Sequence, residues 1–185
     1  MQTYATIKTL RKLGHDVRLV NLIHPKTNIS NKYKSLKSLK GIIRELQFSL
    51  FRKRFFGSIS SKMYSINRKI IPKCDYTVVG SDQVWNSDIT SVLKSSYFLD
   101  FVNEGEKLSY ASSFGKSVWQ ETEVYTNFVK KALACFKAVS VREESGVVLC
   151  KEIFGIKAIQ VLDPTLMHEN YDEIVPRILE KYNEY

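Results

Sequence analysis

Apolar residues recur at helical spacing near the start of the chain. One side of residues 4–13 is apolar, and Gly14 follows as a residue that commonly ends a helix. The apolar positions are Tyr4, Ile7, Leu10 and Leu13. This spacing predicts a helix over residues 4–13, and the apolar run at residues 17–22 predicts a strand directly after it.

Short apolar runs alternate with longer helical patterns in the second half of the chain. Residues 76–80 (YTVVG) form a β-branched run that is typical of a buried parallel strand. Similar patterns predict further strands at residues 97–101, 107–111, 138–141 and 159–162, and helices at residues 119–136, 142–154 and 171–182. This alternation predicts an α/β fold, with a Rossmann-like parallel sheet and helices on both faces.

The order of these patterns also predicts a domain organisation. A doubly wound sheet ordinarily begins with a strand, whereas this chain begins with a helical pattern. We therefore expect residues 1–166 to form a Rossmann-like N-terminal domain that lacks its first strand, with a basic helical insertion at about residues 26–73. Residues 167–185 are expected to form a terminal helix or the start of a linker to an absent second domain.

Positive charge is concentrated in residues 26–73. This segment holds 13 of the 28 lysine and arginine residues and one acidic residue, Glu45, while the whole chain has a net charge of +9. Between Leu36 and Phe51 apolar residues recur every three or four positions, which predicts an amphipathic helix. Two interpretations of the segment stay open. It is either a helix that packs on the domain with its charges in water, or a helix that attaches the protein to an anionic membrane surface. Since no zinc-finger, RNP or helix-turn-helix pattern accompanies the charge, we expect no nucleic-acid partner.

The remaining composition argues against several classes of protein. Hydrophobic residues make up 44% and charged residues 25% of the 185 positions, as in globular proteins rather than disordered chains. No apolar run approaches the roughly 18 residues of a membrane span, and the first residues do not have the pattern of a secretory signal. The three cysteines lack CxxC spacing, and the three histidines lack metal-ligand spacing. We expect a cytoplasmic protein with reduced thiols, no metal and no cofactor.

Candidate functional residues follow the predicted strands, because ligands of an open parallel sheet bind beyond the carboxyl ends of its strands. Four segments meet this condition, at residues 80–86, 112–115, 142–145 and 163–165. The candidate residues are Ser81, Asp82, Gln83, Trp85, Asn86, Ser112, Ser113, Gly115 and Arg142. They do not make up a set of nucleophile, base and orienting group, and the sequence has no GxSxG, Walker or GxGxxG motif.

Several candidates also have a purely structural interpretation. Asp82 is either a catalytic base or the N-cap of a helix, and Trp85 either stacks on a sugar or packs in the core. Ser112, Ser113 and the glycine that follows them either contact a phosphate or sugar, or form an ordinary turn. Arg142 either makes a bidentate contact with a phosphate or carboxylate ligand, or pairs with an acidic residue of the chain.

Six segments, taken together and in this order, resemble the polysaccharide pyruvyl transferase family. The stretch GSDQVWN at residues 80–86 is the most distinctive of them, and the resemblance runs from about residue 2 to residue 166. The segments are residues 4–10 (YATIKTL), 79–86 (VGSDQVWN), 97–101 (YFLDF), 109–115 (SYASSFG), 141–146 (VREESG) and 162–166 (LDPTL).

The resemblance implies an architecture like that of GT-B glycosyltransferases, in which two Rossmann-type domains face a cleft and this chain forms one half. Members of the family transfer a pyruvyl group from phosphoenolpyruvate, the donor substrate, to sugar hydroxyls, which forms a ketal. The acceptor is expected to be a cell-surface polysaccharide or its lipid-linked precursor, reached in the cytoplasm or at the inner membrane leaflet. On this hypothesis Asp82 is the catalytic candidate, and the other eight candidate residues contact or lie near the acceptor.

The family resemblance also implies that the arginine and histidine residues for the donor lie largely in a half that this chain lacks. We therefore expect the chain alone to be an inactive fragment that self-associates through an unpaired strand edge and an uncovered apolar face. Two other functions stay open at this point. One is a GT-B glycosyltransferase that uses a nucleotide sugar, and the other is a non-catalytic remnant or binding module.

Overall fold

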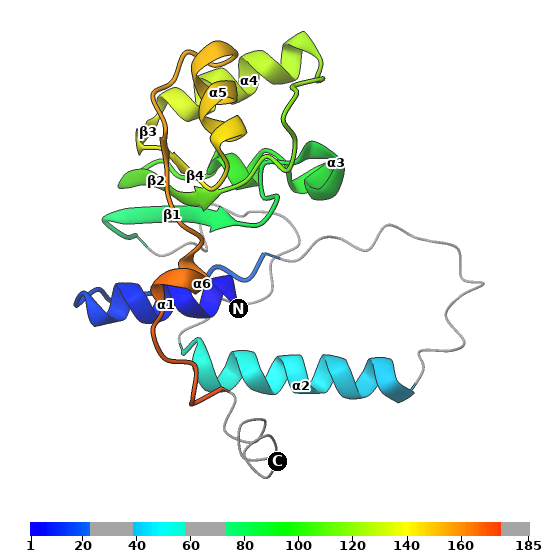
Figure 1. Ribbon diagram of the computed structural model, residues 1–185, viewed down its shortest axis with the longest axis vertical. Coiled ribbons are helices and arrows are strands. Elements are labelled where there is room, and N and C mark those ends of the chain that lie inside the picture. Colours follow the sequence, from blue (N-terminus) through cyan, green and yellow to red (C-terminus); the bar gives the residue numbers. More distant parts are fainter. Residues whose placement is uncertain (23–38, 58–72, 175–185) are drawn as a thin grey trace.

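A computed structural model describes residues 1–22, 39–57 and 73–174, and a parallel sheet lies at its centre (Figure 1). The strands are β1 (Tyr76–Ser81), β2 (Glu106–Ser112), β3 (Phe136–Ala138), β4 (Ser140–Val141) and β5 (Ile159–Gln160). Their order is β1-β2-β4-β5, β3 pairs with β2 beside β4, and every pair is parallel. The parallel sheet predicted from the sequence is therefore confirmed.

Helices alternate with the strands over most of the described chain. They are α1 (Gln2–Lys12), α2 (Leu39–Phe55), α3 (Ser87–Thr90), α4 (Glu123–Ala134), α5 (Glu144–Glu152) and α6 (Pro164–Met167), with short 3₁₀ turns at Ser91–Leu93 and Ser96–Phe98. The helices predicted at residues 4–13, 119–136 and 142–154 correspond to α1, α4 and α5. The mixed α/β class is confirmed with them.

Two predicted strands are wrong. Residues 97–101 form a 3₁₀ turn and a further turn, because Phe98 is fully buried against the indole of Trp85 rather than paired in the sheet. Residues 17–22 contain only isolated bridge positions at Leu19 and Leu22. Of the helix predicted at residues 171–182, residues 171–174 form a turn and the others lie outside the described residues.

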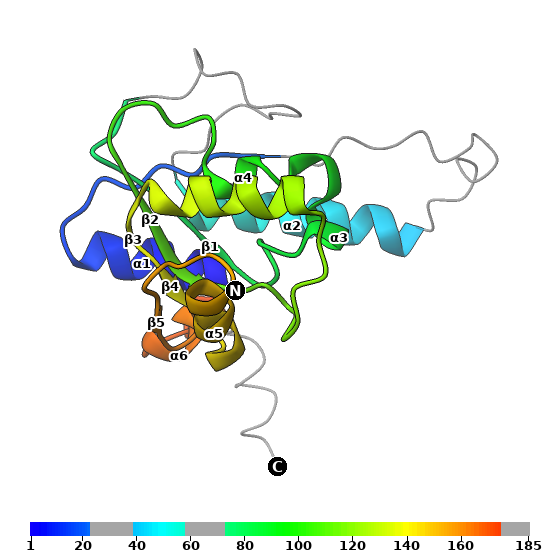
Figure 2. The same ribbon diagram turned by 90° about the horizontal axis from the view of Figure 1, so that it is seen from above.

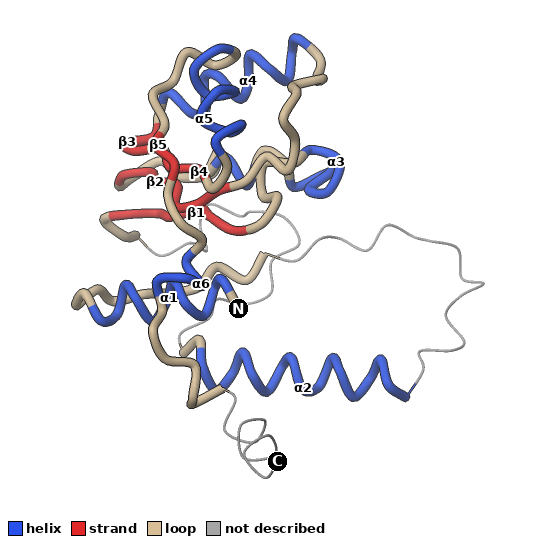
Figure 3. Tube along the Cα trace, in the orientation of Figure 1, coloured by secondary structure: helices blue, strands red, loops and turns tan. Residues whose placement is uncertain are grey.

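The two faces of the sheet are covered unequally. α4 packs on one face through Val129 and Leu133, and α5 through Leu149. These side chains are buried together with Val79 and Val141 of the strands. α1 and α6 lie on the other side of the strands (Figures 1 and 3). We call the buried residues of the first face, which also include Trp85, Phe98 and Phe114, the sheet cluster.

A second, smaller group of buried side chains forms around α1. Tyr4 and Ile7 of α1 pack against Phe56, which follows α2, and Phe51 and Phe55 surround the Tyr4 ring. Tyr171 contacts the same ring, 6.1 Å away between centroids. We call this group the Tyr4 cluster, and it holds α2 and the residues after α6 against α1.

α2 lies within the basic segment at residues 26–73, and a helix is therefore confirmed there. The rest of that segment, residues 26–38 and 58–72, lies outside the described residues. In the described part of the chain, no helix is long and apolar enough to cross a membrane.

Two buried serines join β2 to β4 where the backbone pairing is short. The backbone N–H of Ser140 donates to Oγ of Ser109 at 2.9 Å, and Oγ of Ser140 donates to the Ser109 carbonyl at 2.8 Å. The N–H of Ala111 donates to the same Oγ of Ser140 at 3.2 Å. These side chains satisfy backbone groups that would otherwise be buried without partners, and they position the start of the segment that carries Arg142.

Candidate functional site

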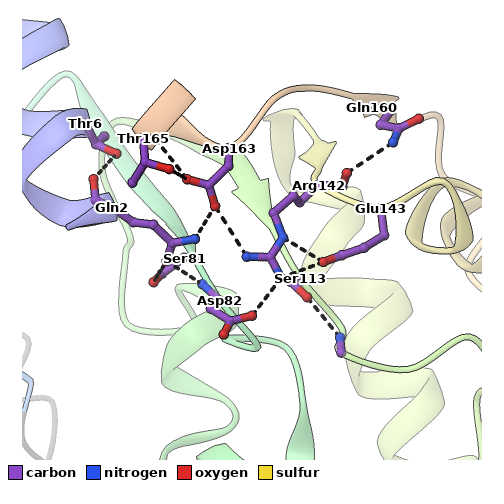
Figure 4. A network of polar contacts seen from close by, with 11 residues as sticks. Gln2, Thr6, Ser81, Asp82, Ser113, Arg142, Glu143, Gln160, Asp163 and Thr165 are labelled. Atoms are coloured by element: carbon purple, nitrogen blue, oxygen red, sulfur yellow. Dashed lines mark hydrogen bonds and ion pairs between the residues drawn. The ribbon is translucent and has the colours of Figure 1, made fainter. Parts of the chain in front are cut away.

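Arg142 lies at the carboxyl ends of the strands, among three carboxylates (Figure 4). Its Nη2 is 2.7 Å from Oδ1 of Asp82, which follows β1, and 2.7 Å from Oε1 of Glu143. Its Nη1 is 3.4 Å from Oδ2 of Asp163, which follows β5. Parallel strands end at the same edge of a sheet, so this edge brings together residues from three separate parts of the chain.

The charges of this cluster do not balance. Three carboxylates surround one guanidinium, so the group carries a net charge of about −2 when all are ionised. Partial burial disfavours the charged form of Arg142, but hydrogen bonds to Asp82 and Glu143 more than offset this and raise its pKa. Arg142 therefore stays cationic, and its N–H groups donate to acidic side chains of the protein. Of the two interpretations of Arg142, the structure supports the ion pair with acidic residues of the chain.

Asp163 is the most buried of the three carboxylates, with 17% of its side chain exposed. Its Oδ1 accepts from the backbone N–H of Thr165 at 2.9 Å and from Oγ1 of Thr165 at 2.6 Å, and it caps α6. Burial alone would raise the pKa of Asp163, but hydrogen bonds from Thr165, Gln2 and Arg142 outweigh burial and lower the pKa. Asp163 is therefore ionised over the ordinary pH range.

Gln2, in the first turn of α1, joins the ends of two strands (Figure 4). Its Oε1 accepts from Oγ of Ser81 at 2.8 Å and from the backbone N–H of Asp82 at 3.0 Å. Its Nε2 donates to Oδ2 of Asp163. The sequence analysis did not select Gln2, because it follows no predicted strand and a single glutamine in the first turn of a helix belongs to no recognisable motif.

The sequence profile of the polysaccharide pyruvyl transferase family matches residues 1–185. This chain belongs to the polysaccharide pyruvyl transferase family. The resemblance of the six segments is thus confirmed, and the match extends over the whole chain. No curated protein and no solved structure matches it.

In this pyruvyl transferase family member, Asp82 is the carboxylate of the cluster that is most open to solvent. Its side chain is 55% exposed, compared with 34% for Glu143. Asp82 does not cap a helix. That role belongs to Asn86, whose Oδ1 accepts from the backbone N–H of Asp88 at the start of α3.

The side chains that follow Asp82 have mainly structural contacts. Gln83 has a φ of +53°, and its Oε1 accepts from Nδ2 of Asn86 at 3.1 Å. Trp85 is buried in the sheet cluster, where it stacks on Phe98 and donates from Nε1 to the carbonyl of Tyr97 at 3.0 Å. The structure therefore supports the interpretation in which the Trp85 indole packs in the core.

The side chains of Ser112, the last residue of β2, and of Ser113 point into the protein. Ser112 and Ser113 are both fully buried. Oγ of Ser112 donates to the carbonyl of Val79 at 3.2 Å, and Oγ of Ser113 accepts from the backbone N–H of Gly115 at 3.0 Å. Gly115 has a φ of +62°, a conformation that glycine adopts most easily. These residues hold the turn beside the cluster in place, and the exposed polar surface belongs to Asp82, Glu143 and Arg142.

Across the described ranges 1–22, 39–57 and 73–174, no group of three or more His, Cys, Asp or Glu residues has a geometry that could hold a metal ion. The carboxylates near Arg142 are directed at its guanidinium. The cluster can therefore accept hydrogen bonds from a neutral, hydroxyl-bearing molecule at Asp82. It can also remove a proton there.

Proposed function

We propose that this family member transfers a pyruvyl group from phosphoenolpyruvate to the hydroxyls of a cell-surface polysaccharide or its lipid-linked precursor. In this proposal the cluster of Asp82, Glu143, Asp163 and Arg142 faces the sugar acceptor. The observation that carries it is the excess of carboxylate in that cluster, together with the exposure of Asp82. The family membership supports the general activity.

The chemistry of ketal formation defines what the acceptor side must do. Two sugar hydroxyls add to the enol carbon of phosphoenolpyruvate and the bond from that carbon to the phosphate oxygen breaks. The two hydroxyls release two protons. The methylene carbon takes up one proton and becomes a methyl group, and the released phosphate takes up the other. Each attacking hydroxyl needs a nearby acceptor for its proton. Asp82 is the carboxylate that is placed for this role.

The charge of the cluster favours the acceptor over the donor. Phosphoenolpyruvate carries a carboxylate and a phosphate, and both would be repelled by a site with an excess of two negative charges. Sugar hydroxyls, by contrast, donate readily to carboxylates. Arg142 is already paired with acidic side chains. We therefore propose that the cations for the donor come from elsewhere in the full-length protein, as in an architecture of two facing Rossmann-type domains.

Replacing Asp82 tests this role. In the full-length protein, Asp82→Asn is expected to lower the rate of pyruvyl transfer at least tenfold, or ~1.4 kcal/mol in the barrier, because the proton acceptor is lost. The affinity for phosphoenolpyruvate, measured by isothermal titration, should change less than about twofold.

A matched control is Asp88→Asn, which removes a second exposed carboxylate that pairs with Lys116 outside the cluster. This variant should transfer at nearly the original rate. An Asp82→Asn enzyme with an unchanged rate would exclude Asp82 as the proton acceptor. If isothermal titration detected binding of a nucleotide sugar but no binding of phosphoenolpyruvate, the protein would instead be a glycosyltransferase.

A further inference from the structure

α2 contacts the rest of the described chain mainly through its last turns. Phe51 and Phe55 lie 6.1 Å and 5.6 Å from the Tyr4 ring between centroids, and Arg52 donates to Oδ1 of Asn21. The other end of the helix, at Leu39, extends away from α1 and from the sheet (Figures 1 and 2). The C-terminal turns of α2 are thus anchored, and its preceding turns project outward.

The projecting part of α2 carries a stripe of exposed apolar side chains. Ile43, Leu46 and Leu50 are 49%, 59% and 65% exposed. They are spaced by three and four residues, so they lie along one side of the helix. A contiguous apolar stripe in water is unfavourable, and it commonly marks a surface that another molecule or a membrane covers.

Basic residues adjoin this stripe. Lys53 and Arg54 come three and four residues after Leu50, so they continue the same side of the helix by one turn, and both are exposed. The guanidinium of Arg54 lies over the ring of Phe55, 5.1 Å from its centroid. By sequence, α2 contains five basic residues and one acidic residue, which are Lys40, Arg44, Arg52, Lys53, Arg54 and Glu45.

We propose that α2 lies along an anionic lipid surface. Ile43, Leu46 and Leu50 enter the boundary between headgroups and acyl chains, while Lys53 and Arg54 contact the anionic headgroups. Apolar side chains flanked by cations are the pattern of helices that lie in the membrane interface. Charge complementarity favours lipid over a second copy of this chain, since two helices with a net charge of +4 repel each other. This inference does not depend on the pyruvyl transfer reaction.

Co-sedimentation of the full-length protein with vesicles tests the proposal. The protein should sediment with vesicles of phosphatidylcholine and phosphatidylglycerol at low salt, and much less at high salt or with phosphatidylcholine alone. The double variant Leu46→Gln/Leu50→Gln should bind at least tenfold more weakly. Lys53→Gln and Arg54→Gln should each weaken binding about fivefold, as expected when one basic contact is lost.

Matched controls come from exposed positions of other helices. Val124→Gln/Val148→Gln removes two exposed apolar side chains from α4 and α5, and Lys130→Gln/Lys131→Gln removes two exposed cations from α4. Both variants should bind vesicles as the unmodified protein does. Circular dichroism of each variant checks that the fold is retained.

Three results would overturn the proposal. One is equal binding to neutral and anionic vesicles, and another is binding that the α2 substitutions leave unchanged. The third is a dimer, seen by light scattering, that dissociates in the Leu46→Gln/Leu50→Gln variant, since the stripe would then be covered by a second copy. Transfer to a soluble acceptor, measured on the same variants, tests the proposed reaction separately.

Discussion

Asp163 combines a buried position with four hydrogen bonds, from Thr165 (two), Gln2 and Arg142. Its pKa is lowered in the folded protein, so the stability that it contributes is present above its ordinary pKa of about 3.9. This contribution is lost as the pH falls through the folded-state pKa. The carboxylate is therefore one source of acid sensitivity in this fold.

The variant Asp163→Asn tests this effect. Near neutral pH it should lower the free energy of unfolding by about 1–3 kcal/mol, because charge-assisted hydrogen bonds to a partly buried group are lost. Near pH 3 the difference from the unmodified protein should be smaller, because protonation of the unfolded chain's carboxyl below its ordinary pKa of about 3.9 removes part of this contribution. Urea unfolding at the two pH values measures the difference in the free energy of unfolding between the two proteins. A difference that stays constant with pH would contradict the stabilising role of the ionised Asp163.

Part of the candidate site was predictable residue by residue. Asp82 and Arg142 each follow a strand, and the rule for ligand positions in parallel sheets predicts that they share one edge. The same rule selected the segment 163–165, which contains Asp163. It did not select Gln2, which lies 161 positions from Asp163 in the sequence and meets it only in the folded chain. Ser112 ends β2 and Ser113 follows it, but both side chains are directed into the protein.

At the scale of elements, β1 and β2 approach so closely that the pairing requires glycine. A Cβ built on Gly80 would lie 1.9 Å from the carbonyl oxygen of Tyr110, in the backbone of the neighbouring strand.

Gly80→Ala should therefore destabilise the protein by about 3 kcal/mol or more, because the two strands must separate to admit the methyl group. Gly155→Ala is a matched control, since a Cβ there meets no atom within 4 Å and the only strain is its φ of +68°. This control should cost roughly 1–2 kcal/mol. Chemical unfolding of the two variants compares them, and equal losses would show that the contact with Tyr110 relaxes easily.

The elements themselves were largely predictable, since periodicity depends on neighbours in the sequence. The prediction failed at residues 97–101, where a short aromatic run was assigned to a strand. Phe98, Leu99 and Phe101 are instead buried in the same cluster as Trp85, and Leu99 has a φ of +54° at the end of the 3₁₀ turn. A short apolar run is compatible with a strand or with a buried turn, so packing against residues distant in the sequence decides which one forms.

At the scale of the whole molecule, the sheet cluster and the Tyr4 cluster are separate groups of buried residues. The smaller one has three buried members, Tyr4, Ile7 and Phe56. Contacts between α1 and α6, and the hydrogen bonds of Gln2, connect them. The sequence indicated the α/β class and the family, but it gave no sign that α2 would pack on α1.

This division predicts two levels of local stability. Backbone amides of α1 should exchange with solvent faster than those of α4, because α1 packs in the small Tyr4 cluster and α4 in the larger sheet cluster. Gln2→Ala should increase exchange in α1 several-fold and leave α4 unchanged. Hydrogen exchange with mass spectrometry measures both helices, and Gln120→Ala, at an exposed glutamine, is the control. An equal response of α1 and α4 would show a single cooperative unit.

The hydrogen bond between Gln2 and Asp163 has a consequence for folding during synthesis. The ribosome adds the partner carboxylate, Asp163, 161 residues after Gln2. Chains fold as they emerge, so α1 must stay without this partner while nearly all of the sheet is translated. A nascent chain that stalls before residue 163 therefore has the residues of all five described strands but lacks the carboxylate that joins Gln2 and Arg142.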